Sequence, residues 1–317
     1  MYNILIIGAV KTTEITLKKL VSYQFNIVGV LGNEPTNKAK VSGWVDLKTI
    51  SKDYKIDYKG FKNINDIDCV NWAIDKKPDI VFAVGFSQLL KDVWLQMPRL
   101  GCIGFHPTNL PEGRGRAPLA WIVLEKKIGS ASFFLMGQGA DDGPIFTQSF
   151  FNVEEEDDAT MVEHKIGKHI GIALNNWLPQ LKKGYWNPIP QKHDLASWYG
   201  KRGPTDGWLN WNDTANNLNR LIKASTKPHP GAYTYFQDSK LIIWKSEIEN
   251  NIKIQGVIGR VLLKDSNKGY LIQCGKGLLW IKEVELELDK VLKVGDKLGY
   301  NIEDEIYKIN KILINAE

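Results

Sequence analysis

Apolar runs of strand length alternate with amphipathic stretches of helix length through the first half of the chain. The runs are rich in Ile, Leu, Val and Phe, which is typical of parallel strands buried on both faces. We expect strands over residues 2–8, 25–31 and 79–84 and helices over 9–22, 44–51 and 66–75. Strands and helices that alternate at this spacing predict an α/β domain built on a doubly wound parallel sheet. No G-x-G-x-x-G follows the first strand, so a dinucleotide site has little support.

The second half changes to shorter strands. A helix with one apolar face is predicted from Thr160 to about Leu178, with Thr160 and Glu163 as a capping box and Pro179 as its end or kink. Residues 184–200 contain two prolines and many polar residues, which is typical of a linker. A further helix is expected over 213–224, followed by strands over 241–245, 256–263, 270–274 and 278–281. We therefore predict one domain over residues 1–190 and a smaller β-rich domain over 200–317.

Length and composition describe an ordinary globular protein. The 317 residues suffice for two cores, and 43% are hydrophobic and 24% charged. No apolar run is long enough for a membrane span, and the N-terminus lacks the basic flank and cleavage site of a signal peptide. Cys69, Cys102 and Cys274 are scattered, which argues against a disulfide framework or a zinc site. We expect a reducing, cytoplasmic setting without membrane association.

The charge pattern bears on the partner. The formal net charge is +5, and Lys and Arg are spread along the chain without a basic stripe. Proteins that bind nucleic acid usually show such a stripe, whereas a mild cationic excess suits a small anionic partner. His164 and His169 lie five residues apart on a predicted helix, so they do not share a face as metal ligands, and we expect no metal.

The densest cluster of candidate chemistry lies between residues 101 and 148. A strand-like run ends in His106, and a second strand over 132–136 leads to an acidic glycine turn that contains Asp141. In an open α/β sheet the ligand crevice lies outside the carboxyl ends of the strands, where both side chains could meet. Imidazole titrates near neutrality and a carboxylate orients it, so they form a candidate proton-handling pair. The alternative is a structural histidine beside a stiff Pro/Gly turn.

The block HPTNLPEGRGRAP, followed by ADDGPI, resembles the folate-dependent formyltransferase family, which includes methionyl-tRNA formyltransferase, glycinamide ribonucleotide transformylase and the sugar N-formyltransferases. The family pattern is Asn-x-His-x-Ser-Leu-Leu-Pro-x-x-Arg-Gly, with Asp-x-Gly about three dozen residues later. His106 and Asp141, 35 residues apart, take the histidine and aspartate positions. The later motifs K-R-x-P-x-D-G and L-I-K-A-x-x-K-P-x-P-G-A resemble the small barrel-like C-terminal domain of methionyl-tRNA formyltransferase and several sugar formyltransferases.

This resemblance implies a Rossmann-like catalytic domain and 10-formyltetrahydrofolate as formyl donor. It implies that His106 polarises the formyl oxygen or takes the amine proton, while Asp141 pairs with it and shuttles the proton. Ser87 has the alternative of a helix cap and Asp142 that of a turn residue. Arg114 and Arg116 either meet an anionic substrate or brace the turn. The residues implied to contact the folate are Phe86, Ser87, Gln88, Leu89, Thr108, Asn109, Leu110, Pro111, Gly139, Asp142 and Gly143.

One position departs from the family pattern. Gly104 stands where the family has the asparagine thought to hold the formyl oxygen, and Asn109, a backbone N–H or water are the alternatives for that role. The dispersed charge and the weakly basic loop 33–43 favour a sugar N-formyltransferase that acts on the amine of a nucleotide-linked amino-dideoxysugar. The alternatives are a methionyl-tRNA formyltransferase and, if Gly104 impairs catalysis, a folate-binding module or formyl-folate hydrolase. The nucleotide, the sugar and a homodimer stay open.

Overall fold

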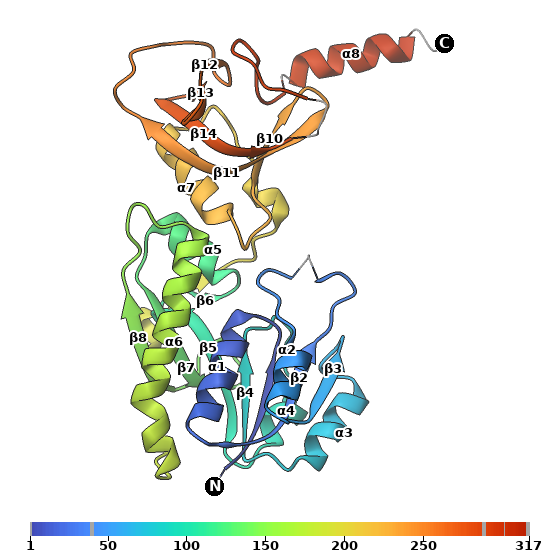
Figure 1. Ribbon diagram of the computed structural model, residues 1–317, viewed down its shortest axis with the longest axis vertical. Helices are drawn as coiled ribbons and strands as arrows, with labels where there is room; N and C mark the ends of the chain where they lie inside the picture. Colours follow the sequence, from blue (N-terminus) through green and yellow to red (C-terminus); the bar gives the residue numbers. More distant parts are fainter. Residues whose placement is uncertain (1, 39–40, 287–289, 301, 315–317) are drawn as a thin grey trace. The chain divides into compact units, whose positions relative to one another are not determined.

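The computed structural model describes residues 2–38, 41–286, 290–300 and 302–314. The chain divides into two compact units whose boundary lies between Arg202 and Gly203. Figure 1 traces both units along the sequence. Within the described residues, no helix combines the length and the apolar character that crossing a bilayer requires.

The first unit is built on a seven-stranded sheet with the order β3-β2-β1-β4-β5-β7-β8. Its five strands from β3 to β5 are parallel, and β7 and β8 continue it antiparallel. The predicted α/β class is confirmed. The four-residue strand β3 was not predicted, because its YKGF sequence is too short and too polar for a periodic signal. The strands are β1 (Asn3–Gly8), β2 (Asn26–Asn33), β3 (Tyr58–Phe61), β4 (Ile80–Val84), β5 (Gly101–Thr108), β7 (Gly129–Leu135) and β8 (Ile145–Phe151).

Helices cover both faces of this sheet. α1 and α6 pack against each other, and α6 also packs on β7 and β8. The opposite face buries side chains of α3 and α4, including Val70 and Trp94, against Leu5, Ile7 and Val81 of the strands. The helices of this unit are α1 (Lys11–Ser22), α2 (Leu47–Asp53), α3 (Ile67–Asp75), α4 (Asp92–Gln96), α5 (Pro118–Glu125) and α6 (Ala159–Lys182).

Both predicted ends of α6 were wrong. Its N-cap is Asp158, whose carboxylate accepts a hydrogen bond from the amide of Met161 at 2.9 Å, so Thr160 lies inside the first turn. The helix also continues through Pro179 to Lys182. A proline removes one backbone hydrogen bond, and the buried side chains of Leu178 and Leu181 hold the last turn in place.

The segment predicted as a linker packs on the first unit instead. We call residues 189–199 the strap. Ile189 forms an antiparallel bridge with Ile145 at the start of β8. Further along, β9 (Trp198–Tyr199) pairs in parallel with β6 (Arg114–Gly115). The strap therefore belongs to the first unit rather than to a linker, and the two units divide only after Arg202.

The second unit holds a five-stranded antiparallel sheet with the order β10-β11-β14-β13-β12. Helix α7 (Ala215–Ser225) packs mainly on β11, and its buried Leu218 and Ile222 join the core of this unit. β10 was not predicted. The strands are β10 (Ala232–Phe236), β11 (Ser239–Glu249), β12 (Val261–Asp265), β13 (Gly269–Gln273) and β14 (Leu278–Glu285).

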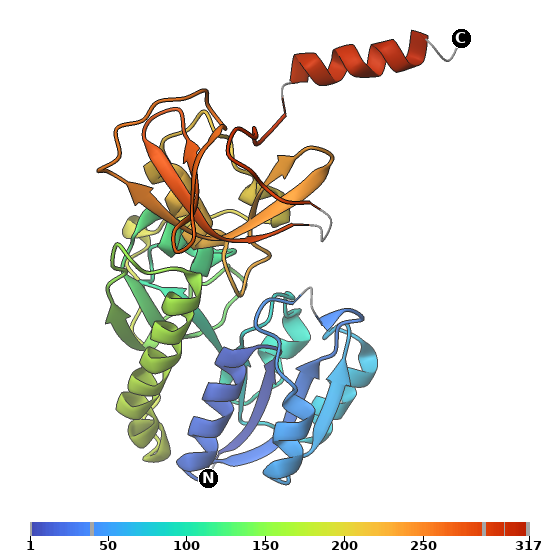
Figure 2. The same ribbon diagram turned by 45° about the horizontal axis from the view of Figure 1, so that its top comes forward.

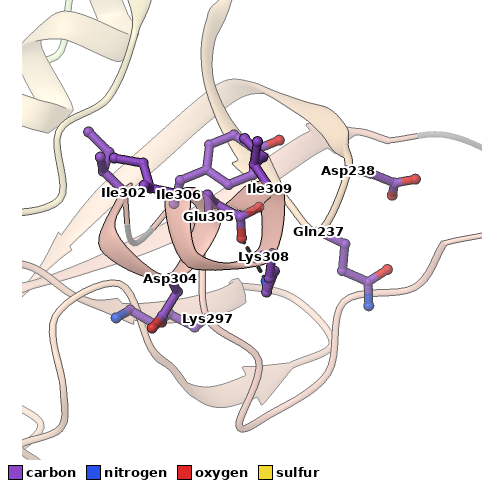
Figure 3. Close-up of a pocket in the computed structure, with 11 residues that line it drawn as sticks. Gln237, Asp238, Lys297, Ile302, Asp304, Glu305, Ile306, Lys308 and Ile309 are labelled. Atoms are coloured by element: carbon purple, nitrogen blue, oxygen red, sulfur yellow. Dashed lines mark hydrogen bonds and ion pairs between the residues drawn. The ribbon is translucent and has the colours of Figure 1, made fainter. Parts of the chain in front are cut away.

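A last helix, α8 (Ile302–Ile314), was also not predicted. None of its described residues is buried, and Figure 2 shows it extending from the sheet of the second unit. In the close-up of Figure 3, Ile302, Ile306 and Ile309 lie on one side of the helix. They border a cavity of about 840 Å³ that reaches Gln237 and Asp238 at the β10–β11 turn. None of the predicted site residues lines this cavity.

Candidate active site

His106 lies on β5, and its side chain is only 6% exposed. Its Nε2 is 2.9 Å from the carbonyl oxygen of Gly113. Because a carbonyl can only accept, Nε2 carries a proton and donates it to Gly113. The other nitrogen, Nδ1, lies 3.5 Å from Oδ2 of Asp141. The imidazole is thus fixed on one side, and the nitrogen that can change protonation faces a carboxylate.

Asp141 reaches His106 from the turn after β7. Its side chain is 21% exposed, so it is the more accessible member of the pair. Oδ2 accepts a hydrogen bond of 2.9 Å from the backbone amide of Gly115. Asp141 has a φ of 53°, in the left-handed region that aspartate adopts more often than most non-glycine residues. Such a conformation persists only where neighbouring contacts hold it.

Gln191 of the strap supplies those contacts. Its Nε2 donates to the carbonyl oxygens of Asp141 at 2.9 Å and Gly143 at 2.7 Å. Its Oε1 accepts from Nε and Nη2 of Arg114 at 3.3 and 2.7 Å. The sequence analysis missed Gln191, because a single glutamine that follows two prolines in a polar segment carries no local signal. Gln191 is buried, which is unusual for a glutamine and is known only from the folded structure.

A second network lies beside His106. Ser132 on β7 pairs with His106 across the strands, and its hydroxyl donates to the carbonyl of Thr108 at 2.7 Å. Nε2 of Gln148 donates to Ser132 Oγ at 3.0 Å and to the carbonyl of Leu110 at 3.1 Å. Satisfied buried polar groups of this kind rigidify the backbone that carries the histidine.

Two clefts lie next to the predicted folate-contacting residues: Leu89 lines one of them, and Thr108 and Asn109 line the other. One, of about 590 Å³, is lined by Leu89, Leu90, Lys91, Asp92, Val93, Leu95, Gly137 and Gln138. The other, of about 320 Å³, is lined by Thr108, Asn109, Glu112, Gly113, Ile122, Lys126, Lys127, Ile128 and Tyr199. The first cleft joins the loop after β4 to the turn after β7. Leu89, Leu90, Val93 and Leu95 make most of its lining apolar, and Lys91, Asp92 and Gln138 add polar side chains.

Other predicted contact residues serve the structure. Gln88 donates to the carbonyl of Lys62 at 2.6 Å and accepts from the amide of Ile64 at 2.8 Å, so its side chain is occupied. Phe86 packs edge-on against Phe61. Ser87 does not cap the next helix, because α4 begins at Asp92 after Lys91.

The glycines of the acidic turn allow it to pack closely. A Cβ on Gly143 would lie 1.7 Å from the carbonyl oxygen of Leu135. A Cβ on Gly139 would lie 1.8 Å from Oδ2 of Asp142. The Asp142 side chain thus folds back over its own turn, which fits the turn-residue alternative. The loop before β6 contains a cis peptide bond between Leu110 and Pro111.

Cys102, four residues before His106 on β5, is the nearest thiol along the chain. Burial raises the pKa of the Cys102 thiol to about 12, so it stays protonated at neutral pH. A protonated thiol is a poor nucleophile. Cys102 is therefore not a candidate nucleophile.

Two family models match the chain: formyl transferase over residues 4–176, and the formyl transferase C-terminal domain over residues 202–300. The chain belongs to the formyl transferase family. This confirms the resemblance drawn from the His106 and Asp141 motifs, and the family is one of formyl-transferring enzymes.

A curated relative of this formyl transferase is the bifunctional polymyxin resistance protein ArnA of Wigglesworthia glossinidia brevipalpis, 33% identical over 246 residues. The match covers 77% of this chain and 38% of that protein, so the chain spans well under half the length of this relative. The N-formyltransferase of Helicobacter canadensis, solved with folinic acid and dTDP-3-aminofucose, superposes with a TM-score of 0.66 at 15% identity. That match covers 89% of this chain and 99% of the other.

Methionyl-tRNA formyltransferase from Clostridium thermocellum also superposes, with a TM-score of 0.55 at 16% identity. The match covers 80% of this chain and 96% of the other. At these identities the two solved structures show a shared fold. One was solved with dTDP-3-aminofucose and the other is named for methionyl-tRNA, so the superpositions do not choose between a sugar and a tRNA acceptor.

Gly104 leaves no room for the asparagine of the formyl transferase pattern. It lies on β5 two residues before His106, on the same face of the strand. A Cβ at this position would lie 2.6 Å from Cζ of Phe134 and 2.9 Å from Cγ of Met136. Asn109 lines the cleft of about 320 Å³.

The two arginines of the motif have different surroundings. Arg114 is buried, and its guanidinium contacts Gln191, Nδ1 of His193 and the ring of Trp198. These contacts match the alternative in which Arg114 braces the turn. Arg116 is exposed at the same loop, and its backbone amide donates to the carbonyl of Tyr199 at 3.1 Å. Its guanidinium is therefore the one of the two that solvent and ligands can reach.

Proposed function

We propose that this protein transfers a formyl group from 10-formyltetrahydrofolate to the amine of a nucleotide-linked amino sugar. The observation that carries the proposal is the His106–Asp141 pair, with 3.5 Å between Nδ1 and Oδ2, in a chain of the formyl transferase family. Relatives in this family include proteins solved with folinic acid and with a nucleotide-linked aminosugar.

Formyl transfer joins an amine nitrogen to the formyl carbon and breaks the bond from that carbon to the folate nitrogen. A proton must leave the amine, and another must reach the departing nitrogen. Asp141 is the more exposed member of the pair, so we assign it the contact with the amine. Asp141 receives the proton that leaves the amine and passes it to Nδ1 of His106, which in turn supplies a proton for the departing folate nitrogen, while Nε2 stays hydrogen-bonded to Gly113. The imidazolium that forms is stabilised by the carboxylate beside it.

The donor is assigned to the cleft of about 590 Å³. Leu89, Leu90, Val93 and Leu95 give it an apolar wall, and Lys91 and Gln138 give it polar groups. The formyl donor supplies an activated one-carbon unit when bound, and the chain supplies its position beside Asp141 through the 137–143 turn. Arg116 is assigned to an anionic group of the acceptor, because its side chain is exposed at this loop.

The acceptor is inferred from charge. A net charge of +5 without a basic stripe suits a diphosphate better than the backbone of a tRNA. The methionyl-tRNA alternative and a formyl-folate hydrolase stay as outcomes of the same experiment. Because Gly104 replaces the family asparagine, a formyl-folate hydrolase and a non-catalytic folate-binding module are the alternative functions that the experiment distinguishes.

The test follows tetrahydrofolate release by absorbance with nucleotide-linked amino sugars, with methionyl-tRNA and without an amine. Release that depends on an amino sugar supports the proposal. Release that depends on methionyl-tRNA, or on no amine, gives the tRNA enzyme or the hydrolase. Binding of folate without release identifies a binding module.

The pair itself is tested by His106→Ala and Asp141→Asn. Each variant is expected to lower turnover by about 10²–10⁴-fold, the usual share of a positioned acid or base. Circular dichroism should stay native. A variant that turns over at the unsubstituted rate removes that residue from the mechanism.

A further inference from the structure

We propose that Gln191 is the positioning residue of this site: it holds Asp141 at the distance and orientation that His106 requires. Only the rate measurements that test this inference rest on the proposed function. Gln191 lies 50 residues from Asp141 along the chain, on the strap, and touches neither the imidazole nor the carboxylate. Its contact is with the backbone that aims the carboxylate.

All the hydrogen-bonding groups of the Gln191 amide are used. An amide nitrogen has two donors, and here they meet the carbonyls of Asp141 and Gly143. The amide oxygen has two lone pairs, and here it accepts twice from Arg114. The side chain is buried, so water does not replace these bonds. Gln191 therefore joins both ends of the Asp141–Gly143 turn to the loop that carries Gly115.

The turn requires this hold at Asp141. Aspartate tolerates a φ of 53° better than most residues, but the right-handed and extended regions are the commoner ones, so a residue released from its contacts would relax toward them. Relaxation would swing Oδ2 away from the amide of Gly115 and from Nδ1 of His106. The carboxylate itself accepts a backbone hydrogen bond from the amide of Gly115 at 2.9 Å. The two hydrogen bonds from Gln191 hold the backbone carbonyls at both ends of the turn that carries it.

The strap contacts the histidine side as well. Ser197 Oγ accepts from the amide of Gly113 at 2.9 Å, and the Ser197 carbonyl accepts from the amide of Arg114 at 2.9 Å. The carbonyl of Gly113 is the acceptor for Nε2 of His106. One segment thus positions both members of the pair, and Gln191 is the part that reaches the carboxylate.

Gln191→Glu is the sharpest variant. A glutamate keeps the acceptor toward Arg114 but places oxygen against the carbonyls of Asp141 and Gly143, so only the clamp on the turn is lost. We expect kcat to fall by about 10–100-fold with little change in KM for the formyl donor, because misplacement of about 1 Å costs up to 10² in rate. Gln191→Ala, which also frees Arg114, should lose at least as much.

The Asp141→Asn background separates positioning from a general structural role. If Gln191 acts through Asp141, Gln191→Glu should cause no further loss of rate in that background.

A matched control is Gln273→Ala in the second unit. Gln273 also bridges two backbone groups, with its oxygen accepting from Gly256 at 3.0 Å and its nitrogen donating to Cys274 at 2.9 Å. It should lower thermal stability without changing kcat.

A readout independent of turnover keeps this inference apart from the proposed function. The ring ¹H–¹⁵N signals of His106, assigned with His106→Gln, should move in Gln191→Glu in the same direction as in Asp141→Asn. Unchanged His106 signals together with an unchanged kcat would overturn the positioning role. A full further loss of rate in the Asp141→Asn background would also overturn it. If no amine is formylated but the His106 signals move, the proposed function fails and the positioning role stands.

Discussion

At position 104 the chain lacks a side chain where the family pattern has an amide. The space that this amide would take is closed by Phe134, which is buried on β7, and by Met136. The proposed proton-handling pair lies beside it, with Nδ1 and Oδ2 3.5 Å apart. Under the proposed function, His106 and Asp141 account for proton transfer, and the donor to the formyl oxygen must come from a group other than residue 104.

Gly104→Asn should not restore the family site. The new side chain meets Phe134 and Met136 within 3 Å, so overpacking should lower the free energy of unfolding by about 1–3 kcal/mol. Urea denaturation measures this, and kcat should not rise. Gly200→Asn is the control, because a Cβ there meets nothing within 4 Å. An unchanged stability with a faster rate would show that the pocket admits the amide after all.

At the scale of single elements, Glu249 ties the end of β11 to β14. Its carboxylate accepts from Trp280 Nε1 at 2.8 Å and from the amides of Asn251 and Ile252 at 2.7 and 3.2 Å. The hydrogen bond from Trp280, followed by the one from Asn251, lowers the pKa of Glu249 from 4.5 to about 2. A carboxylate with a depressed pKa stabilises the fold only while it is ionised.

Acid should reveal this contribution. The stabilisation is complete above the unfolded pKa of 4.5 and is lost as the pH falls toward the folded value of about 2. The thermal midpoint of Glu249→Gln should therefore lie below that of the unsubstituted protein above pH 5, and the difference should narrow between pH 4.5 and 2. Glu247→Gln on the same strand is the control, since Glu247 is an exposed partner of Lys282. A gap that stays constant with pH would contradict the assignment.

At the scale of the whole molecule, charge is the property that bears on the acceptor. The chain carries 41 Lys and Arg against 36 Asp and Glu. Within the described residues many of the lysines lie in ion pairs, including those of Lys165 with Asp157 and Lys282 with Glu247. Paired cations contribute little to a long-range field. A protein of this kind should recognise a few phosphates locally rather than a nucleic-acid backbone.

Salt dependence tests this view. A protein that neutralises six to ten phosphates loses about 10³–10⁵ in affinity between 50 and 200 mM salt. For a nucleotide-linked sugar, KM should rise by less than about tenfold over the same range. The KM is measured from initial rates at a fixed concentration of formyl donor, and only the sodium chloride concentration differs between one series and the next. A steep loss with salt would favour the tRNA alternative.

Much of the fold and part of the site follow from local patterns. The apolar runs that became β1, β2 and β4 are long and uninterrupted, so periodicity found them, whereas β3 and β10 are too short or too polar. His106 and Asp141 were identified because each lies in a short local motif, and the fold then brought these two motifs together across 35 residues. The family is likewise fixed by the sequence alone.

The tertiary structure decided what surrounds the pair. Gln191 and Ser197 reach the site from a segment that reads as a linker, across 50 residues to Asp141 and 84 to Gly113. Arg114 is buried and Gly104 is walled in by Phe134, and neither fact has a local signal. Hydrophobic periodicity and motif spacing record which face of an element is buried. They do not record which distant backbone groups a polar side chain will satisfy, because those partners meet only when the chain is folded.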